Sequence, residues 1–397
     1  MARITWPKGK RPCFIGVGNT KATRYGNRSL SSLASEAALT AIADAGLEPK
    51  DIDGLSVHPR APYDNARNIP GYDVVDYVHM QHILPLENVR WWYNSLGTMA
   101  ATSIIEAANA LASGAVNYVL AWRALHHPAG ERYNQSRAGG AAGPAQWKGP
   151  YGHSVANQVQ ATHYQRYLEK YGAKREEMAA VVLNDNRNAQ LNEYAVWNGR
   201  PITRDDYLNS RIIAWPMSIF DNDMPVDEAG AVIMTTEDRA KDAPSRGGYI
   251  AGYAETPYNK TTPNVVQSLE EQYEAHFLMA KNLYESAGMS PKDVDLIHVY
   301  NGYSPMVWNW LEVFGFCPEG EAHNWTQNGA IALEGPHPIN TAGGNLGEGR
   351  LHGWSHIRET ALQTMGRAGP RQLKKCDVAL CEVGPFFGGA AYICTRE

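Results

Sequence analysis

Residues 45–58 of the chain read AGLEPKDIDGLSVH, and residues 287–300 read AGMSPKDVDLIHVY. The two stretches are identical at seven of fourteen positions, and each follows an apolar run with helical spacing and leads into a strand-like run. Such a repeat indicates an internal duplication, with two α/β halves built in the same order. It places His58 and Tyr300 at the ends of equivalent strands, which is where functional groups gather in layered α/β folds.

The residues around the repeat predict alternating strands and helices in both halves. Small apolar residues recur at helical spacing over 31–45, and Gly46 suits the end of that helix because glycine readily adopts the left-handed conformation. In the first half we expect strands at 13–18, 52–57, 88–94, 117–122 and 229–236, and a second helix at 102–114. In the second half we expect strands at 247–253, 295–300, 377–383 and 388–395, and helices at 268–288 and 352–366.

The region 125–223 interrupts this order. It is rich in Gly, Asn, His and Tyr, and residues 138–153 read AGGAAGPAQWKGPYGH. We expect a long irregular cap here, because such a region is usually functional when it lies inside a compact fold. The chain then divides into an N-terminal half at 1–245, which includes this cap, and a C-terminal half at 246–397.

Composition and cysteine usage exclude several classes of protein. A net charge of −5 without an extended basic block argues against a nucleic-acid partner. No window has the roughly 18 consecutive apolar residues of a membrane helix, and the first residues have no sustained secretory apolar region, so we expect a cytoplasmic protein without a membrane span. The five cysteines form no CxxC pair, which favours free thiols over disulfides. The spacing of His126, His127, His153 and His163 fits no zinc motif, so no metal site is expected.

The chain resembles the thiolase superfamily, in the branch of lipid-transfer or sterol-carrier type. The resemblance covers nearly the whole chain and rests on the order and spacing of several blocks. These are residues 16–55, ALASGAVNYVLAW at 110–122, GFCPEGEA at 315–322, PINTAGGNLGEGRLHG at 338–353 and FFGGAAYI at 386–393. It implies an α/β thiolase fold, in which duplicated βαβαβαββ halves form a five-layer αβαβα core, commonly as a homodimer.

The catalytic blocks depart from the family pattern. Where the resemblance places the nucleophilic cysteine, seventeen residues before Gly114, the chain has Gly97. The nearest hydroxyls are those of Ser95 and Thr98, and neither has a base beside it in the sequence. The family's second cysteine has no direct counterpart, although Cys381 lies two positions from its place. Acyl transfer through a cysteine is therefore not expected.

An oxyanion pocket without a thiol still suffices for the retro-aldol cleavage of a β-hydroxyacyl-CoA. The sequence resembles the thiolase-like aldolases that shorten steroid side chains in this way, and the resemblance places a catalytic tyrosine at Tyr300. Because a phenol has a pKa near ~10 in water, Tyr300 needs a neighbouring cation such as Arg350 to act as a base near neutrality. The alternative is a strand aromatic that packs in the core.

Arg350 stands where the related aldolases carry a second tyrosine. Since arginine stays protonated, it can bind the enolate oxygen or act on Tyr300 while His352 transfers the proton. Arg350 can equally serve a structural role, such as pairing with Glu348. His352 is the third catalytic candidate, with a place at a helix end as its alternative.

The candidate substrate-binding residues are His58, Asn94, Gly97, Gly344 and Gly388. Buried hydrogen bonding is the ordinary role of a strand-end histidine such as His58. Asn94 precedes the turn that lacks the cysteine and can orient the thioester. The glycines permit the close backbone approach that an oxyanion pocket of N–H groups requires, unless they only form turns.

The resemblance implies a carbon–carbon lyase, an aldolase that releases a ketone or aldehyde and a shorter acyl-CoA. Aromatic residues at 91–93 and between 303 and 354 favour a bulky acyl chain such as a steroid, although core packing also explains them. No cofactor is expected besides the CoA of the substrate. A zinc-ribbon and OB-fold partner of the DUF35 type, giving a heterotetramer, is implied as well. The alternatives are a non-catalytic protein that binds acyl-CoA or lipid, and a cysteine-independent acyltransferase.

Overall fold

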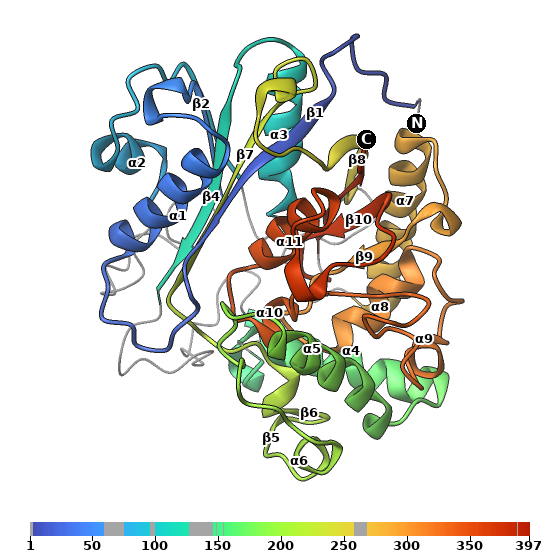
Figure 1. Ribbon diagram of the computed structural model, residues 1–397. Helices are drawn as coiled ribbons and strands as arrows, with labels where there is room; N and C mark the ends of the chain where they lie inside the picture. The colour runs from blue at the N-terminus through green and yellow to red at the C-terminus, as the bar shows by residue number, and fades with distance from the viewer. Residues whose placement is uncertain are drawn as a thin grey trace.

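Two β-sheets organise the molecule (Figure 1). The computed structural model describes residues 3–58, 75–95, 100–126, 146–147, 149–153, 155–257, 268–386 and 388–397. The first sheet has the order β1 (Pro12–Asn19), β7 (Glu228–Thr236), β4 (Val119–Leu125), β2 (Gly54–Val57) and β3 (Trp91–Asn94). The second has the order β8 (Tyr249–Glu255), β11 (Ala390–Thr395), β10 (Val378–Glu382) and β9 (Leu296–His298). Each sheet is therefore drawn from one half of the chain.

Helices complete a five-layer core. Helix α1 (Leu30–Asp44) covers the outer face of the first sheet, and α7 (Leu269–Ala287) covers that of the second. Between the sheets lie α3 (Ala101–Ala112), which contacts β7 and β11, and α11 (Trp354–Thr364), which contacts β7 and β10 (Figure 1). The order helix, sheet, helices, sheet, helix confirms the predicted five-layer α/β fold.

The repeated stretch has the same local structure in both copies. Gly46 and Gly288 have φ angles of 73° and 67°, which only glycine adopts without strain. A short 3-10 helix follows in each copy, at Pro49–Asp51 and at Pro291–Asp293. The strand after it, β2 or β9, pairs in parallel with β4 or β10. The internal duplication predicted from the sequence is thus visible in the backbone.

One identical residue of the repeat ties neighbouring strands together in each half. The carboxylate of Asp53 accepts hydrogen bonds from the backbone N–H groups of Asn117 and Tyr118, just ahead of β4. The carboxylate of Asp295 accepts from Asp377 and Val378, at the start of β10. Charge-assisted bonds of this kind are stronger than those between neutral groups, so the two aspartates fix where the parallel strands begin.

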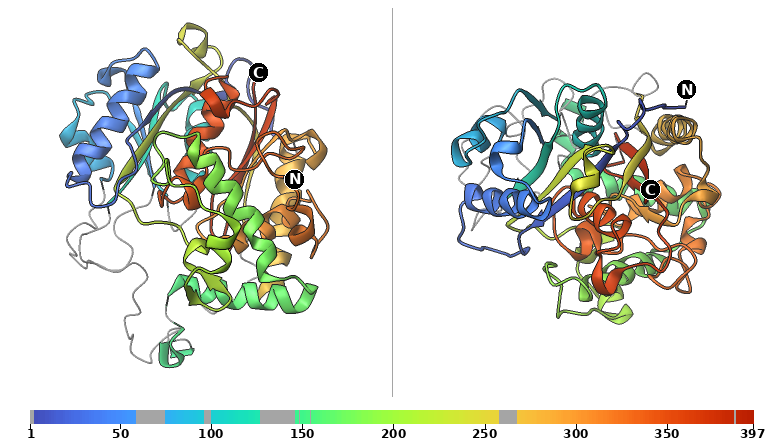
Figure 2. Two further views of the ribbon diagram at one scale, coloured as in Figure 1. Left: turned by 60° about the horizontal axis from the view of Figure 1, so that its bottom comes forward. Right: turned by 45° about the horizontal axis from the view of Figure 1, so that its top comes forward.

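The prediction of an irregular region at 125–223 is wrong over much of its length. It contains α4 (Ala156–Tyr171), α5 (Ala179–Gln190), α6 (Arg204–Leu208), β5 (Ile212–Ala214) and β6 (Met217–Ser218). These elements form a lobe below the two sheets (Figures 1 and 2). The apolar period that predicts a helix is hidden in α4, because its buried face carries Asn157, Gln160 and His163. Residues 127–145, with His127, lie outside the described part.

Four further helices were not predicted: α2 (Tyr77–Ile83), α8 (Pro305–Val313), α9 (Ala322–Trp325) and α10 (Gly344–Gly347). Every residue of α8 is buried, so no polar face marks it in the sequence. Three of the tryptophans expected to wall a substrate site, Trp308, Trp310 and Trp354, are completely buried core residues. Within the described residues, no helix is long and apolar enough to cross a membrane.

The cysteines are buried free thiols, as predicted. Burial raises the pKa of Cys13, Cys376 and Cys381 to about 12 in each case, and it raises the pKa of Cys317 and Cys394 as well. A thiol is nucleophilic only as the thiolate. These side chains therefore belong to the core.

Candidate functional site

The candidate site lies where the two halves bring their strand ends together. His58 follows β2, and its backbone N–H donates to Trp122 in β4. Ser95 follows β3, and its N–H donates to Val57. His352 comes from the other half, in the loop between α10 and α11, and its ring lies 6.1 Å from that of His58, edge to face. Residues far apart in the sequence thus meet at one corner.

His58 and Ser95 form a close hydrogen bond between the ring Nδ1 and the hydroxyl. Both side chains are completely buried, and the Nε2 of His58 has no hydrogen-bond partner among the described residues. The sequence showed no base beside Ser95, because the base comes from the next strand of the sheet. Ser95 is covered on all sides, so it is not placed as an exposed nucleophile.

His352 is held in a conformation that is rare for a residue with a side chain. Its φ angle is 53°, and such strain is usually found where function requires it. A guanidinium nitrogen of Arg123, a buried residue of β4, lies 3.3 Å from the ring Nδ1. Since guanidinium groups only donate, Nδ1 is the acceptor. His352 therefore joins the two halves at the site.

Both histidines are neutral at physiological pH. Burial lowers the pKa of His58 well below its usual value, and the charge of Arg123 lowers it further. Burial also lowers the pKa of His352, with Arg350, Arg123 and His58 adding to the effect. Arg350 is therefore close enough to act on His352 electrostatically. Two guanidinium groups, of Arg123 and Arg350, therefore act on this corner.

Tyr300 is buried at the other strand end, after β9. Its backbone N–H donates to the carboxyl of Glu382 over 2.9 Å. Its ring is so close to Gly353 that a Cβ on that glycine would lie 3.2 Å from Cδ2 of the tyrosine. Because Gly353 directly follows His352, the three predicted catalytic residues Tyr300, Arg350 and His352 belong to one region.

A chain of amides fixes the loop that carries His352. Asn301 donates to the buried carboxyl of Asp185 over 2.8 Å and accepts from the backbone N–H of Asn345 over 2.7 Å. The side chain of Asn345 in turn accepts from Gly353 over 3.0 Å. A Cβ on Gly344 would lie 2.5 Å from the amide of Asn301, which explains the glycine there. Gly344 thus permits close packing around this loop.

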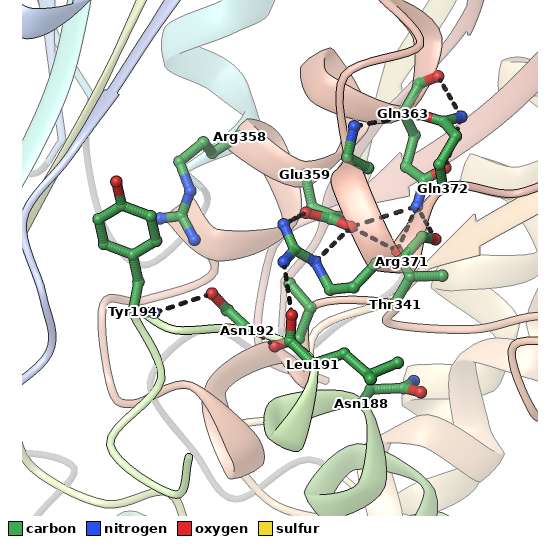
Figure 3. A network of polar contacts seen from close by, with 12 residues as sticks. Asn188, Leu191, Asn192, Tyr194, Thr341, Arg358, Glu359, Gln363, Arg371 and Gln372 are labelled. Atoms are coloured by element: carbon green, nitrogen blue, oxygen red, sulfur yellow. Dashed lines mark hydrogen bonds and ion pairs between the residues drawn. The ribbon is translucent and has the colours of Figure 1, made fainter.

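Helix α11 is anchored by a buried polar network behind the site (Figure 3). The guanidinium of Arg371 pairs with Glu359 at 2.9 Å and donates to the backbone oxygen of Leu191 at 3.1 Å. Glu359 also accepts from Thr341. Glu348, the residue that was considered as a partner of Arg350, pairs with Arg358. The network therefore connects α11 to the loop at Thr341 and to the end of α5.

The predicted oxyanion pocket of backbone N–H groups is wrong at the C-terminal glycines. The N–H of Gly388 already donates to Pro385, and that of Gly389 to Thr256. Asn94 is partly buried at the end of β3, and its amide oxygen has no partner among the described residues. Gly97 and Thr98 lie outside the described part of the chain.

Sequence reasoning missed Arg123, Asn301, Asp185 and Glu382. A charged residue inside the apolar run 119–125 was the signal for Arg123, because a buried charge requires a reason. No local signal marked the others, since their partners are distant in sequence. Among the described residues no group of three histidine, cysteine or acidic side chains is placed to hold a metal ion.

Comparisons with known proteins agree with this arrangement. Residues 261–391 match the family model described as "Thiolase C-terminal domain-like". The "Steroid side-chain-cleaving aldolase" of Thermomonospora curvata is 31% identical over 370 residues, which span 89% of this chain and 90% of that protein. The "17-hydroxy-3-oxo-4-pregnene-20-carboxyl-CoA lyase" of Mycobacterium tuberculosis is also 31% identical, over 366 residues, which span 89% of this chain and 91% of that protein.

The chain belongs to the thiolase superfamily, within the family of these aldolases. A solved structure described as "Ltp2-ChsH2(DUF35) aldolase" has a TM-score of 0.86 and 28% identity, with 97% of this chain and 98% of that chain covered. Human mitochondrial 3-ketoacyl-CoA thiolase shares the thiolase fold at a TM-score of 0.65, with 14% identity and coverage of 98% and 99%. This member of the superfamily has kept the fold without a cysteine at position 97.

Proposed function

We propose that this protein is a carbon–carbon lyase that cleaves the side chain of a β-hydroxyacyl-CoA, with a steroid as the acyl group. The observation that carries the proposal is the corner formed by His58 and His352, with Tyr300 packed beside Gly353, which has hydrogen-bonding groups and guanidinium groups nearby but no thiol. Such a corner can stabilise a thioester enolate but cannot hold an acyl-enzyme on sulfur. The kinship with side-chain-cleaving aldolases supports the same reaction.

The retro-aldol reaction is balanced without any further reactant. A base takes the proton of the β-hydroxyl group, and the oxygen forms a carbonyl as the Cα–Cβ bond breaks. The electron pair of that bond moves to Cα and is delocalised onto the thioester oxygen as an enolate. Protonation of Cα gives the shorter acyl-CoA. Because the reaction is redox-neutral, the proposal requires no cofactor besides the CoA of the substrate.

The proposed roles follow the chemistry of each side chain. Tyr300 exchanges the proton of the substrate hydroxyl, since a phenol can both donate and accept. Arg350 supplies positive charge to the enolate rather than a proton. His352 contacts the thioester, and Asn301 and Asn345 position its loop.

We also propose a partner of the DUF35 type in a heterotetramer with a homodimer of this chain. The support is the similar aldolase structure whose name includes such a component. The five free thiols favour the cytoplasm as the place of action, because thiols stay reduced there.

The proposal is tested by supplying the purified protein with 17-hydroxy-3-oxo-4-pregnene-20-carboxyl-CoA, the compound in the name of the mycobacterial relative. Mass spectrometry should detect a 17-ketosteroid and propionyl-CoA in equal amounts. Tyr300→Phe should lower kcat about 10³-fold, as expected for a lost proton-transfer group. Tyr284→Phe, which removes a hydroxyl bonded to the backbone of Phe314, is the matched control and should keep full activity.

An inactive preparation is assayed again after co-expression with a DUF35-type protein. If no β-hydroxyacyl-CoA is cleaved in either form, while acyl-CoA still binds in calorimetry, the lyase proposal fails in favour of a binding role. If cleavage occurs but Tyr300→Phe retains full turnover, the role of Tyr300 is wrong.

A further inference from the structure

The proton positions on His58 follow from the partner of each ring nitrogen. Ser95 is completely buried, and Nδ1 of His58 is its side-chain hydrogen-bond partner. A buried hydroxyl needs an acceptor for its proton, so Ser95 donates to Nδ1. In the neutral ring the proton then lies on Nε2. That N–H is buried and has no acceptor among the described residues.

His352 has the same tautomer for a different reason. The guanidinium of Arg123 donates to its Nδ1, at 3.3 Å, and guanidinium nitrogens never accept. The proton of the neutral ring is again on Nε2. None of the hydrogen bonds found between described residues uses this atom, and the side chain keeps a small exposure of 7%. Two neighbouring rings therefore each present an N–H donor for which the described residues supply no acceptor.

We propose that the Nε2–H groups of His58 and His352 together form the oxyanion site that binds the thioester oxygen of the enolate. This inference rests on the proposed retro-aldol function and names the groups that stabilise its intermediate. Ser95 is a positioning residue for His58, and Arg123 is one for His352. One donor comes from each half of the duplicated chain, so the oxyanion site is built across the internal pseudo-symmetry.

Three observations support this site over a purely structural pair. A buried N–H donor without an acceptor lowers stability, and a bound thioester oxygen would satisfy it. The left-handed backbone at His352 is strain of the kind that functional sites retain. The N–H groups of Gly388 and Gly389 are already bonded and cannot serve. The imidazole N–H groups thus supply donors that Gly388 and Gly389 cannot.

The test is hydrogen exchange at Cα of propionyl-CoA in D2O, which reverses the last step and needs no steroid. Mass spectrometry measures the rate for the wild type, His58→Leu, His58→Gln and Ser95→Ala. We expect His58→Leu to lower kcat about 100-fold with little change in KM, as for other lost oxyanion donors. His58→Gln should recover about tenfold of this loss, because its amide N–H replaces the Nε2 donor. Ser95→Ala should lower kcat about tenfold, since the ring loses its fixed tautomer.

A second serine–histidine pair provides the matched control. Ser31 and His79 are hydrogen-bonded over 3.0 Å in the N-terminal half, with Ser31 on α1 and His79 on α2. His79→Leu and Ser31→Ala should leave the exchange rate unchanged. Thermal unfolding of each variant identifies those that do not fold, and 15N NMR of labelled histidine reads the tautomers in the wild type. Protonated Nδ1 atoms at His58 and His352 would overturn the proposal.

The remaining outcomes separate this proposal from the proposed function. Exchange of propionyl-CoA without steroid cleavage refutes the lyase proposal and supports the oxyanion site if His58→Leu abolishes the exchange. If the protein cleaves the steroid substrate but does not exchange propionyl-CoA, the same variants are measured in the cleavage assay. The same ratios of variant to wild-type kcat are expected there. A folded His58→Leu protein within threefold of the wild-type rate, or no difference between His58→Leu and His58→Gln, refutes the oxyanion site. A wild type that shows neither reaction overturns both.

Discussion

The two copies of the repeated stretch agree in the residues that hold the fold and differ in those that face the site. Asp53 and Asp295 are identical and do the same work, accepting hydrogen bonds from the N–H groups where the neighbouring strand begins. The last residues, His58 and Tyr300, differ, and both lie at the corner where the halves meet. The identical aspartates thus belong to the scaffold, whereas the last residues of the two copies differ and lie at the candidate site.

The equivalent helices show the same contrast. Between the sheets, α3 buries mostly alanine, isoleucine and leucine, whereas α11 buries His356, Arg358 and Glu359. On the outer faces, the buried side chains of α1 are all apolar, whereas α7 buries Gln272 and His276. Helices α1 and α3 of the N-terminal half are thus packed mostly through apolar side chains. Helices α7 and α11 of the C-terminal half also bury polar side chains, and substitution of these residues tests the comparison.

Breaking the network of α11 should have the largest effect on stability. Arg371→Met leaves the buried carboxylate of Glu359 without its guanidinium partner, and removing one member of a buried ion pair costs about 3–5 kcal/mol. The unfolding free energy in guanidinium chloride measures this loss. Arg166→Met breaks an exposed pair with Glu270 and should cost less than about 1 kcal/mol. Equal losses in the two variants would contradict a network that anchors the helix.

Removing the identical aspartates tests whether the repeat is scaffold in both halves. Asp53→Ala and Asp295→Ala each free two backbone donors, and we expect a loss of about 2–3 kcal/mol in each variant. Each aspartate also binds one basic side chain, Arg90 or Lys375, so the loss should be greater for Asp53 because it is the more buried, at 6% exposed. Asp51→Ala removes an exposed hydrogen bond from the backbone N–H of Glu48 to the carboxylate of Asp51. It should lower the unfolding free energy by about 1 kcal/mol or less. A loss at Asp53 alone would show that the two copies are not equivalent.

The buried histidine of α7 should make stability depend on pH in a way that α1 does not. His276 packs against Trp310 and Phe386, and burial lowers its pKa to about 3. The unfolded chain takes up a proton near pH 6.5 but the folded protein does not, so this residue reduces stability as pH falls below 6.5. Unfolding of His276→Phe and wild type is compared from pH 7.5 to 5.

The variant lacks this proton uptake. Its stability relative to wild type should therefore rise by about 2 kcal/mol between pH 6.5 and 5, at 1.36 kcal/mol per pH unit. Phe277→Leu, the neighbouring half-exposed position, is the control and should show no such trend. Parallel curves for His276→Phe and wild type would mean that the buried ring takes up a proton in the folded state.

Local patterns allowed the strands and helices of both halves to be predicted, and the resemblance to the thiolase superfamily implied their five-layer order. Apolar spacing and the repeated PKD turns mark the strands and outer helices of both halves, and they were confirmed. Helices α4 and α8 were not predicted, because α4 buries polar side chains and α8 buries every side chain. Neither therefore shows the usual amphipathic period. Prediction failed where burial did not follow hydrophobicity.

The site was less predictable than the fold. Tyr300, Arg350 and His352 could be proposed from blocks of sequence, and the structure places them in one region. Ser95 and Arg123 act through contacts with residues 37 and 229 positions away in the chain, and no local pattern encodes such a separation. Proton positions on the histidines likewise depend on these partners.

The backbone N–H groups of His58 and Tyr300 have different acceptors. Changing the acceptor of Tyr300 should have the smallest effect on the unfolding free energy. His58 donates its N–H to the backbone of Trp122, whereas Tyr300 donates to the side chain of Glu382. Burial raises the pKa of Glu382 well above its usual value, which favours the neutral acid in the folded protein. Glu382→Gln keeps an acceptor of the same shape, and at pH 5 it should change the unfolding free energy by less than about 1 kcal/mol.

Glu382→Ala should cost more, about 1–3 kcal/mol, because the N–H of Tyr300 loses its partner. The unfolded chain ionises this carboxyl above pH 4.5 while the folded protein does not, so wild type loses stability as pH rises. The unfolding free energy of Glu382→Gln relative to that of wild type should therefore rise from pH 5 to 8, by as much as 1.36 kcal/mol per pH unit. If the unfolding free energy of Glu382→Gln instead falls relative to wild type as pH rises, Glu382 is ionised beside Tyr300. The strand end after β9 then carries a charge that the strand end after β2 lacks.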